Sequence, residues 1–266
     1  MLTNYHTHTT FCDGKNTPEE IIRYAIDKGF DAIGFSGHGY TPYDLRYCMK
    51  DTDAYSTEIT RLKEKYRENI QIYLGIEEDA FSPVNRNAFD YVIGSSHYYL
   101  LNGKYYPIDS SLDYFKNCLE VFDYNVERMT EEYFGAFCKY ILSRNPDIIG
   151  HFDLITKFDE KHTDIFLKNP IYTKIVEKYT KVIASDCHIF EANTGAIARG
   201  LRTSIYPAEN LLKIIKDSDS GLILASDSHT VESLDAHFEE TRAYLKDIGF
   251  AFVYSLLDGR FQKDYL

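Results

Sequence analysis

The chain has 266 residues, is 44% hydrophobic and has 41 acidic against 29 basic residues, which gives a formal net charge of −12. This length and composition allow a buried core and exclude a disordered protein, while the acidic balance argues against nucleic acid as the main partner. No apolar run is long enough to span a membrane, no secretory signal is expected at the N-terminus, and the five cysteines form no CxxC pair. We therefore expect a reduced, cytoplasmic protein without a membrane partner.

Short apolar runs alternate along the chain with longer stretches of helical periodicity. The first helix is expected to follow Thr17, because Thr17 is a good N-cap, Pro18 suits the first helical position and Gly29 is a suitable end. Further helices are predicted at 53–67, 111–143, from 170 onward, at 208–216 and at 234–249, and a hairpin-like turn at 257–260. Seven strands are predicted at 2–6, 31–36, 70–76, 91–95, 147–150, 189–193 and 221–226.

This alternation predicts an α/β fold with a parallel sheet. Because the strands end in polar residues, we favour a closed barrel with one site at the C-terminal rim of the strands, and a doubly wound open sheet is the competing architecture. No linker or repeat interrupts the pattern, so a single domain over residues 1–266 is expected. It would include a mainly helical segment at about 100–143, whose role the sequence leaves open.

Histidine or acidic side chains follow six of the seven predicted strands. His6 and His8 lie two apart after the first strand, so both imidazoles can point to the same side. Imidazole and carboxylate together are the ligand set of zinc, manganese or iron. The sequence therefore predicts a metal centre, to which the later strand ends contribute His38, Glu77, His97, His151, Asp227 and His229.

Three other histidines are not expected to bind metal. His188 falls at the start of a strand, at the opposite end of the expected barrel. His162 precedes a helix among charged residues, and His237 falls within a predicted helix, so both are expected to be solvated.

Taken together, these motifs resemble the PHP (polymerase and histidinol phosphatase) family, and within it the histidinol-phosphate phosphatases of histidine biosynthesis. The matching motifs occur in family order between residues 6 and 229. They are His6-Thr7-His8, Phe11-Cys12-Asp13-Gly14, Gly37-His38, Gly75-Ile76-Glu77, Gly94-Ser95-Ser96-His97, Gly150-His151-Phe152-Asp153-Leu154, Asn193-Thr194-Gly195 and Ser226-Asp227-Ser228-His229. The resemblance implies a distorted seven-stranded (β/α) TIM-like barrel that holds three divalent metal ions, with zinc, manganese and iron as the candidates.

The resemblance also implies how the ligands are divided. The first metal would be held by His6, His8, Glu77 and Asp227. Glu77 would bridge to a second metal, which His97 and His151 also hold, and Asp13, His38 and His229 would hold the third. Many relatives have a histidine in the loop of Asp13, so a simple turn aspartate before Gly14 remains the alternative there.

Other polar residues are expected around the ligands. Asp153, two residues after His151, could orient an imidazole. Arg199 and Arg202 are both candidates to bind phosphate, and Glu191 could pair with a substrate amine. Glu78 and Asp79 are expected to be neighbours of the site rather than ligands.

The activity implied is hydrolysis of L-histidinol phosphate to L-histidinol and inorganic phosphate. Clustered divalent ions would lower the pKa of a bridging water, so that metal-bound hydroxide is the expected nucleophile, and the proton donor is left open. The alternatives are a PHP phosphoesterase acting on nucleotides or other small phosphate esters, and a non-catalytic metal-binding barrel. A small molecule is the expected partner, and the oligomeric state is left open.

Overall fold

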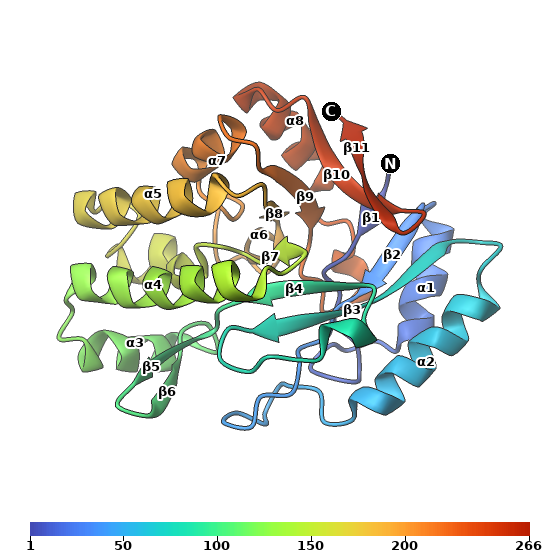
Figure 1. Cartoon of the computed structure of the whole chain (residues 1–266), viewed down its shortest axis with the longest axis horizontal. Coiled ribbons are helices and arrows are strands. Elements are labelled where there is room, and N and C mark those ends of the chain that lie inside the picture. Colours follow the sequence, from blue (N-terminus) through green and yellow to red (C-terminus); the bar gives the residue numbers. More distant parts are fainter.

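A curled nine-stranded sheet runs through the centre of the computed structural model, which describes residues 1–266 (Figure 1). Neighbouring strands pair in parallel except for the last two, which form an antiparallel hairpin. The seven predicted strands and the predicted C-terminal hairpin are thus confirmed. In sheet order the strands are β1 (Thr3–Asn4), β2 (Ala32–Phe35), β3 (Gln71–Asp79), β4 (Tyr91–Ser95), β7 (Ile148–Ile149), β8 (Ile189–Asn193), β9 (Gly221–Ala225), β10 (Phe252–Leu257) and β11 (Arg260–Tyr265).

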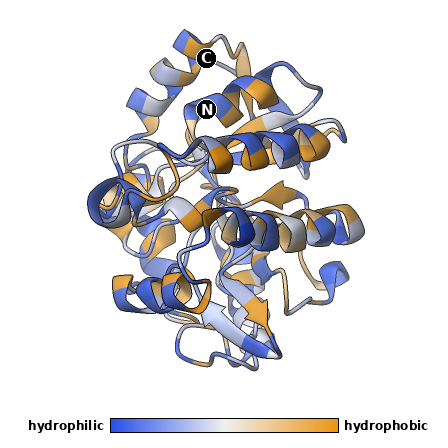
Figure 2. Ribbon diagram, turned by 90° about the vertical axis from the view of Figure 1, so that its left-hand side faces the viewer, coloured by the Kyte–Doolittle hydropathy of each residue, from blue (hydrophilic) through white to orange (hydrophobic).

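Helices surround the outside of the sheet, and hydrophobic and hydrophilic residues alternate along them (Figure 2). The predicted N-cap of the first helix is confirmed, because the Thr17 hydroxyl accepts from the Glu20 N–H and the Glu20 carboxylate accepts from the Thr17 N–H. No helix is both long and apolar enough to cross a membrane. The helices are α1 (Pro18–Asp27), α2 (Thr52–Lys65), α3 (Leu112–Val121), α4 (Val126–Arg144), α5 (Pro170–Ala184), α6 (Gly195–Ala198), α7 (Glu209–Lys216) and α8 (Phe238–Ile248).

Two segments differ from the prediction. The segment at about 100–143, predicted as mainly helical, begins with a small hairpin, β5 (Tyr98–Leu101) and β6 (Lys104–Pro107), and continues as two helices, α3 and α4. The last predicted helix starts at Phe238 instead of residue 234, because His237 has a left-handed backbone (φ 61°) that a helix cannot include.

The curl of the sheet brings two distant parts of the chain together. Just beyond β1 and β9, Thr7 forms a parallel bridge with Ser228. The N–H of His8 donates to the Ser228 carbonyl (2.8 Å), and the N–H of Ser228 donates to the His6 carbonyl (3.0 Å). The segments that carry His6, His8, Asp227 and His229 therefore lie side by side.

Tyr91 fills the inside of the curl. Its ring is fully buried, and its hydroxyl donates to the Tyr5 carbonyl on the far side of the sheet. Gly75 makes room for this ring, because a Cβ at residue 75 would lie 2.2 Å from Cζ of Tyr91. The glycine in β3 is thus required by close packing inside the sheet.

We expect Gly75→Ala to lower the free energy of unfolding by about 1–3 kcal/mol, the usual effect of overpacking a core. Gly135→Ala in α4 is the matched control, because its Cβ would approach the Tyr179 hydroxyl at 3.3 Å and alanine favours a helix. Urea denaturation gives the free energy of unfolding of both variants. A Gly75→Ala protein as stable as the wild type would contradict the packing of Tyr91.

Candidate metal centre

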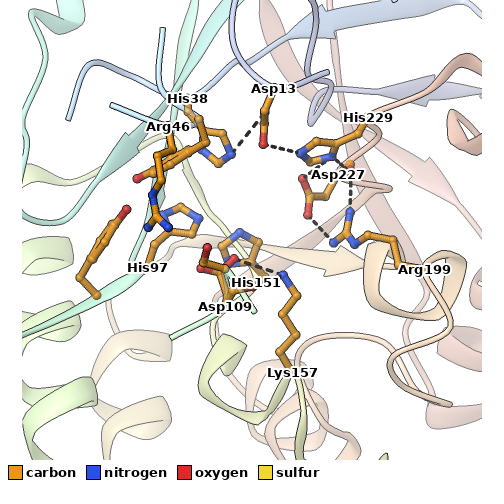
Figure 3. A pocket seen from close by; sticks show the side chains of 13 residues that line it. Asp13, His38, Arg46, His97, Asp109, His151, Lys157, Arg199, Asp227 and His229 are labelled. Carbon is orange, nitrogen blue, oxygen red and sulfur yellow. Dashed lines mark hydrogen bonds and ion pairs between the residues drawn. The ribbon is translucent and has the colours of Figure 1, made fainter. Parts of the chain in front are cut away.

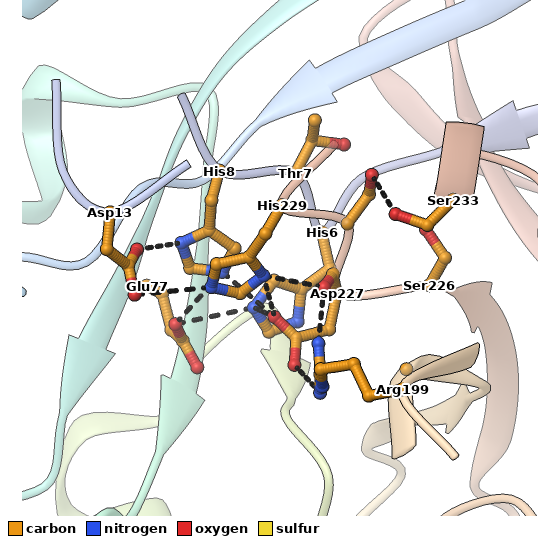
Figure 4. A network of polar contacts seen from close by, with 12 residues as sticks. His6, Thr7, His8, Asp13, Glu77, Arg199, Ser226, Asp227, His229 and Ser233 are labelled. Atoms are coloured by element: carbon orange, nitrogen blue, oxygen red, sulfur yellow. Dashed lines mark hydrogen bonds and ion pairs between the residues drawn. The ribbon is translucent and has the colours of Figure 1, made fainter. Parts of the chain in front are cut away.

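All nine side chains predicted as metal ligands lie close together (Figures 3 and 4). Most follow the carboxyl end of a strand, and Glu77 lies near the end of β3. Their nitrogen and oxygen atoms fall into four overlapping groups, each with its atoms within 4.8 Å of one another. The groups are His8–Asp13–His38–His229, His6–Glu77–His151, His6–His8–Asp227 and His38–Glu77–His97.

The fully buried carboxylate of Glu77 lies in the middle of this arrangement. Its Oε2 lies 2.8 Å from Nδ1 of His38 and 3.3 Å from Nε2 of His6. Its Oε1 lies 3.1 Å from Nε2 of His151 and 3.3 Å from Nε2 of His97. The two oxygens therefore face different imidazoles, which is the geometry that a bridging carboxylate requires.

Asp227 lies on the opposite side of the first two histidines (Figure 4). Its Oδ1 is 3.0 Å from Nε2 of His8 and 3.5 Å from Nε2 of His6. Its other oxygen accepts from Nη2 of Arg199 at 2.7 Å, and its carbonyl accepts from Nη1 of the same guanidinium at 2.9 Å. Arg199 therefore holds Asp227 in place from the side of the pocket.

Asp13 lies among the histidines. Its carboxylate oxygens lie 3.3 Å from Nε2 of His229, 3.5 Å from Nδ1 of His8 and 3.8 Å from Nε2 of His38. The loop folds tightly against the first strand, because a Cβ at Gly14 would meet the His8 backbone at 2.5 Å. Gly14 thus permits the close turn that brings Asp13 to the site.

The donor atoms fit a group of cations. Nε2 of His6, Nε2 of His8 and Oε2 of Glu77 are buried and make no hydrogen bond. Buried polar atoms without partners cost about 1–3 kcal/mol each, and a metal ion among them would satisfy all three. Imidazole nitrogens and carboxylate oxygens are suitable ligands for zinc, manganese and iron.

The carboxylates remain ionised in spite of their burial. Burial acts to raise the pKa of Glu77, but the imidazoles of His38 and His6 lower it well below its ordinary value. Burial likewise acts to raise the pKa of Asp227, which Arg199 and His6 lower well below the usual range. Ionised carboxylates are the form that binds a metal ion.

The imidazoles differ from one another in protonation. Burial, with the neighbouring imidazoles of His229 and His38, lowers the pKa of His8 to about 3, so His8 is neutral. Burial also acts to lower the pKa of His6, but the carboxylates of Glu191 and Glu77 raise it well above its ordinary value. A metal ion that binds Nε2 of His6 must therefore displace a proton.

Glu191 does not have the role predicted from the sequence. It is buried away from the pocket, and its Oε1 lies 2.6 Å from Nδ1 of His6. Its Oε2 accepts from the His151 N–H at 3.0 Å and from the Asn193 side chain at 2.9 Å. The prediction that Glu191 pairs with a substrate amine is therefore wrong, because the side chain is fully buried, does not line the pocket and holds protein groups instead.

Two further predictions are also wrong. Asp153 contacts no imidazole, and its Oδ2 instead accepts from the Ala208 N–H at 3.1 Å and lies 3.8 Å from Nη1 of Arg202. Arg202 does not line the pocket: its side chain is fully buried and donates to the hydroxyls of Thr156 (2.7 Å) and Ser204 (3.1 Å). Of the two predicted arginines, only Arg199 lines the pocket.

The three histidines that were not expected to bind metal lie outside the candidate site. His188 precedes β8, and His162 and His237 are exposed to solvent. None of them belongs to the metal-ligand groups.

Six of the candidate ligands line a pocket of about 260 Å³, namely Asp13, His38, His97, His151, Asp227 and His229 (Figure 3). Its other lining residues come from loops and from β5, where no periodic pattern or motif singles them out. They are Arg46, Tyr47, Tyr98, Asp109, Ser110, Lys157 and Arg199, and of these only Arg199 was predicted.

Comparison with known proteins identifies the family of this fold and site. The model of the PHP domain matches residues 4–195, and the chain belongs to the PHP domain family.

Several relatives cover almost the whole chain. A protein of Schizosaccharomyces pombe named "Probable histidinol-phosphatase" is 28% identical over 274 residues, which cover 94% of this chain and 87% of that protein. The histidinol-phosphatase of Bacillus subtilis is 23% identical and covers 88% of this chain and 96% of its own length. A solved structure of histidinol phosphate phosphatase from Lactococcus lactis, complexed with zinc, L-histidinol and phosphate, has a TM-score of 0.73 and 22% identity, covering 98% of this chain and 99% of that one.

We expect Glu191→Gln to weaken zinc binding by about 10- to 100-fold, because an amide cannot accept all three of the hydrogen bonds that hold His6, the His151 backbone and Asn193. Competition with a chromogenic chelator measures the dissociation constant. Glu131→Gln is the control, since Glu131 pairs on the surface with Lys178. Equal zinc affinity in the two variants would contradict the orienting role of Glu191.

Proposed function

We propose that this protein is a metal-dependent phosphomonoesterase that hydrolyses L-histidinol phosphate to L-histidinol and inorganic phosphate. The observation that carries the proposal is the convergence of eight imidazole and carboxylate side chains around Glu77, beside one pocket. The relatives named histidinol-phosphatase, and the Lactococcus lactis structure with zinc, L-histidinol and phosphate, support the choice of substrate. This activity belongs to histidine biosynthesis.

We further propose that the curled sheet is a distorted (β/α)7 barrel, that residues 1–266 form one domain, and that the site occupies the C-terminal rim of the strands. The bridge between Thr7 and Ser228 supports closure of the barrel, because it joins the segments beyond β1 and β9. Opposite this rim, the Tyr5 hydroxyl donates to the Leu256 carbonyl of β10 at 2.7 Å.

The proposed site holds three divalent cations. The two oxygens of Glu77 support its bridging role, because each faces a different set of imidazoles. The proposed ligands are His6, His8, Glu77 and Asp227 for the first ion, Glu77, His97 and His151 for the second, and Asp13, His38 and His229 for the third.

When bound, the cations would neutralise the phosphate dianion and activate water for attack on phosphorus. The protein supplies the groups that hold the substrate. Arg199 lies on the pocket wall, where its remaining N–H groups can donate to phosphate oxygens while the guanidinium also holds Asp227.

Asp109 is the pocket carboxylate outside the proposed ligand set, and we propose that it receives the ammonium group of L-histidinol phosphate. It lies beside Lys157, whose Nζ is 3.2 Å from its Oδ2 (Figure 3). Burial acts to raise the pKa of Asp109, but Lys157 and the imidazoles of His97 and His151 lower it below its ordinary value. The resulting anion is suited to a cationic group of the substrate.

Glu77→Gln is expected to lose at least one metal ion and to lower turnover of L-histidinol phosphate at least about 100-fold, because an amide cannot bridge two cations as a carboxylate does. Metal content by mass spectrometry and phosphate release are measured on the same samples. His237→Ala, on the exposed N-cap of α8, is the control and should match the wild type. Full turnover in Glu77→Gln would contradict the bridging role.

Asp109→Asn is expected to raise KM for L-histidinol phosphate about 10-fold, the effect of losing one charge-assisted hydrogen bond, and to leave KM for phenyl phosphate unchanged. Asp113→Asn, exposed in the first turn of α3, is the control. Equal effects on both substrates would contradict the proposed contact. A higher kcat/KM on nucleotides in the wild type would favour a phosphoesterase of different specificity, and no turnover on any phosphate ester would favour a non-catalytic metal-binding protein.

A further inference from the structure

A tyrosine outside every predicted motif begins a hydrogen-bonded chain that ends at His97. The hydroxyl of Tyr43 donates to Oδ1 of Asp79 at 2.6 Å, and Oδ2 of Asp79 accepts from Nδ1 of His97 at 3.1 Å. We propose that Tyr43 is a positioning residue that orients the His97 imidazole through Asp79. This inference rests on the proposed metal centre and adds a residue to it.

The place of Asp79 in β3 accounts for its contact with the site. Asp79 lies two residues after Glu77, so both side chains point to the same side of the strand, while Glu78 points to the other side. Glu78 accordingly pairs with Arg144 (2.8 Å) and with the Tyr140 hydroxyl (2.8 Å), away from the pocket. The sequence Glu77-Glu78-Asp79 therefore supplies two inward carboxylates with different partners.

Both oxygens of Asp79 are occupied by protein donors. Oδ1 accepts from the Tyr43 hydroxyl and from the Phe81 N–H (3.0 Å), and Oδ2 accepts from the His97 N–H and Nδ1 (both 3.1 Å). The residue is buried and does not line the pocket. Asp79 thus holds His97 and is not itself placed to bind a cation.

The consequence for His97 is a fixed ring orientation. With Nδ1–H donated to Asp79, the other nitrogen, Nε2, points toward Oε1 of Glu77 at 3.3 Å, where the second cation is proposed. Nδ1 of His151, by contrast, has no hydrogen-bond partner. Of the two imidazoles at the proposed second cation, only that of His97 is therefore oriented by a carboxylate, and this carboxylate, Asp79, is the one that Tyr43 holds.

The β5–β6 hairpin holds the Tyr43 ring. This ring stacks on Tyr105 of β6, with the centroids 3.8 Å apart and the planes at 10°. It also meets the edge of Tyr98 in β5, at 5.1 Å and 82°. Because β5 begins directly after His97, the hairpin returns to support the histidine that precedes it, and this gives the unpredicted segment at 98–107 a role.

The test compares two variants that each lose one hydroxyl and keep the aromatic ring. In Tyr43→Phe, one of the bound zinc ions should bind about 3- to 10-fold more weakly, the effect of losing one hydrogen bond. In Tyr105→Phe, whose hydroxyl lies outside the chain to His97, zinc affinity should match the wild type. Stepwise competition with a chelator on the full-length protein measures each dissociation constant, and a cooperative thermal unfolding transition of the metal-free proteins shows that both variants are folded.

Asp79→Asn should weaken the binding of the same zinc ion by about 10- to 100-fold. Adding Tyr43→Phe to Asp79→Asn should cause no further loss, because both changes interrupt one chain of contacts. If the Asp79 variant fails to fold, the comparison of Tyr43→Phe with Tyr105→Phe decides alone.

Equal zinc affinity in Tyr43→Phe and Tyr105→Phe would overturn the positioning role and leave the proposed function intact. Additive losses in the double variant would overturn it too, because they would show that Tyr43 acts independently of Asp79. A wild-type protein that binds no zinc would refute the proposed metal centre itself, and this inference with it.

Discussion

The structure depends on a buried carboxylate surrounded by imidazoles. Removing an ionised carboxylate from water costs several kcal/mol unless positive charge or hydrogen-bond donors surround it. Both oxygens of Glu77 are approached by imidazole nitrogens that come from four different places in the chain. The sheet must curl to bring these places together, so the fold and the charge of one side chain are linked.

The curl also explains why residues far apart in the sequence act together. The bridge between Thr7 and Ser228 aligns the two segments that carry ligands from the beginning and near the end of the chain. Inside the sheet, the Tyr91 hydroxyl donates to the Tyr5 carbonyl, and Gly75 leaves space for the Tyr91 ring. The packing inside the sheet and the alignment of the ligand segments are thus both features of the curl.

The strands and the grouping of the candidate ligands could be predicted because apolar runs end directly before histidine or acidic residues. The β5–β6 hairpin was missed although Asn102-Gly103 is a typical turn pair, because the surrounding segment has a helical pattern. The partners of Glu191 and Arg202 could not be predicted, since sequence gives the side of a strand on which a residue lies but not which distant group meets it there. Tyr43 and Asp109 lie outside regular patterns, and only tertiary contacts identify them.

The most direct test of the account is a crystal structure of the zinc-loaded protein with anomalous diffraction measured at the zinc absorption edge. The account predicts anomalous peaks on both sides of the Glu77 carboxylate, one toward His6 and His8 and one toward His97 and His151. Peaks only at other places on the molecule, or a Glu77 carboxylate with no ion beside either oxygen, would contradict it.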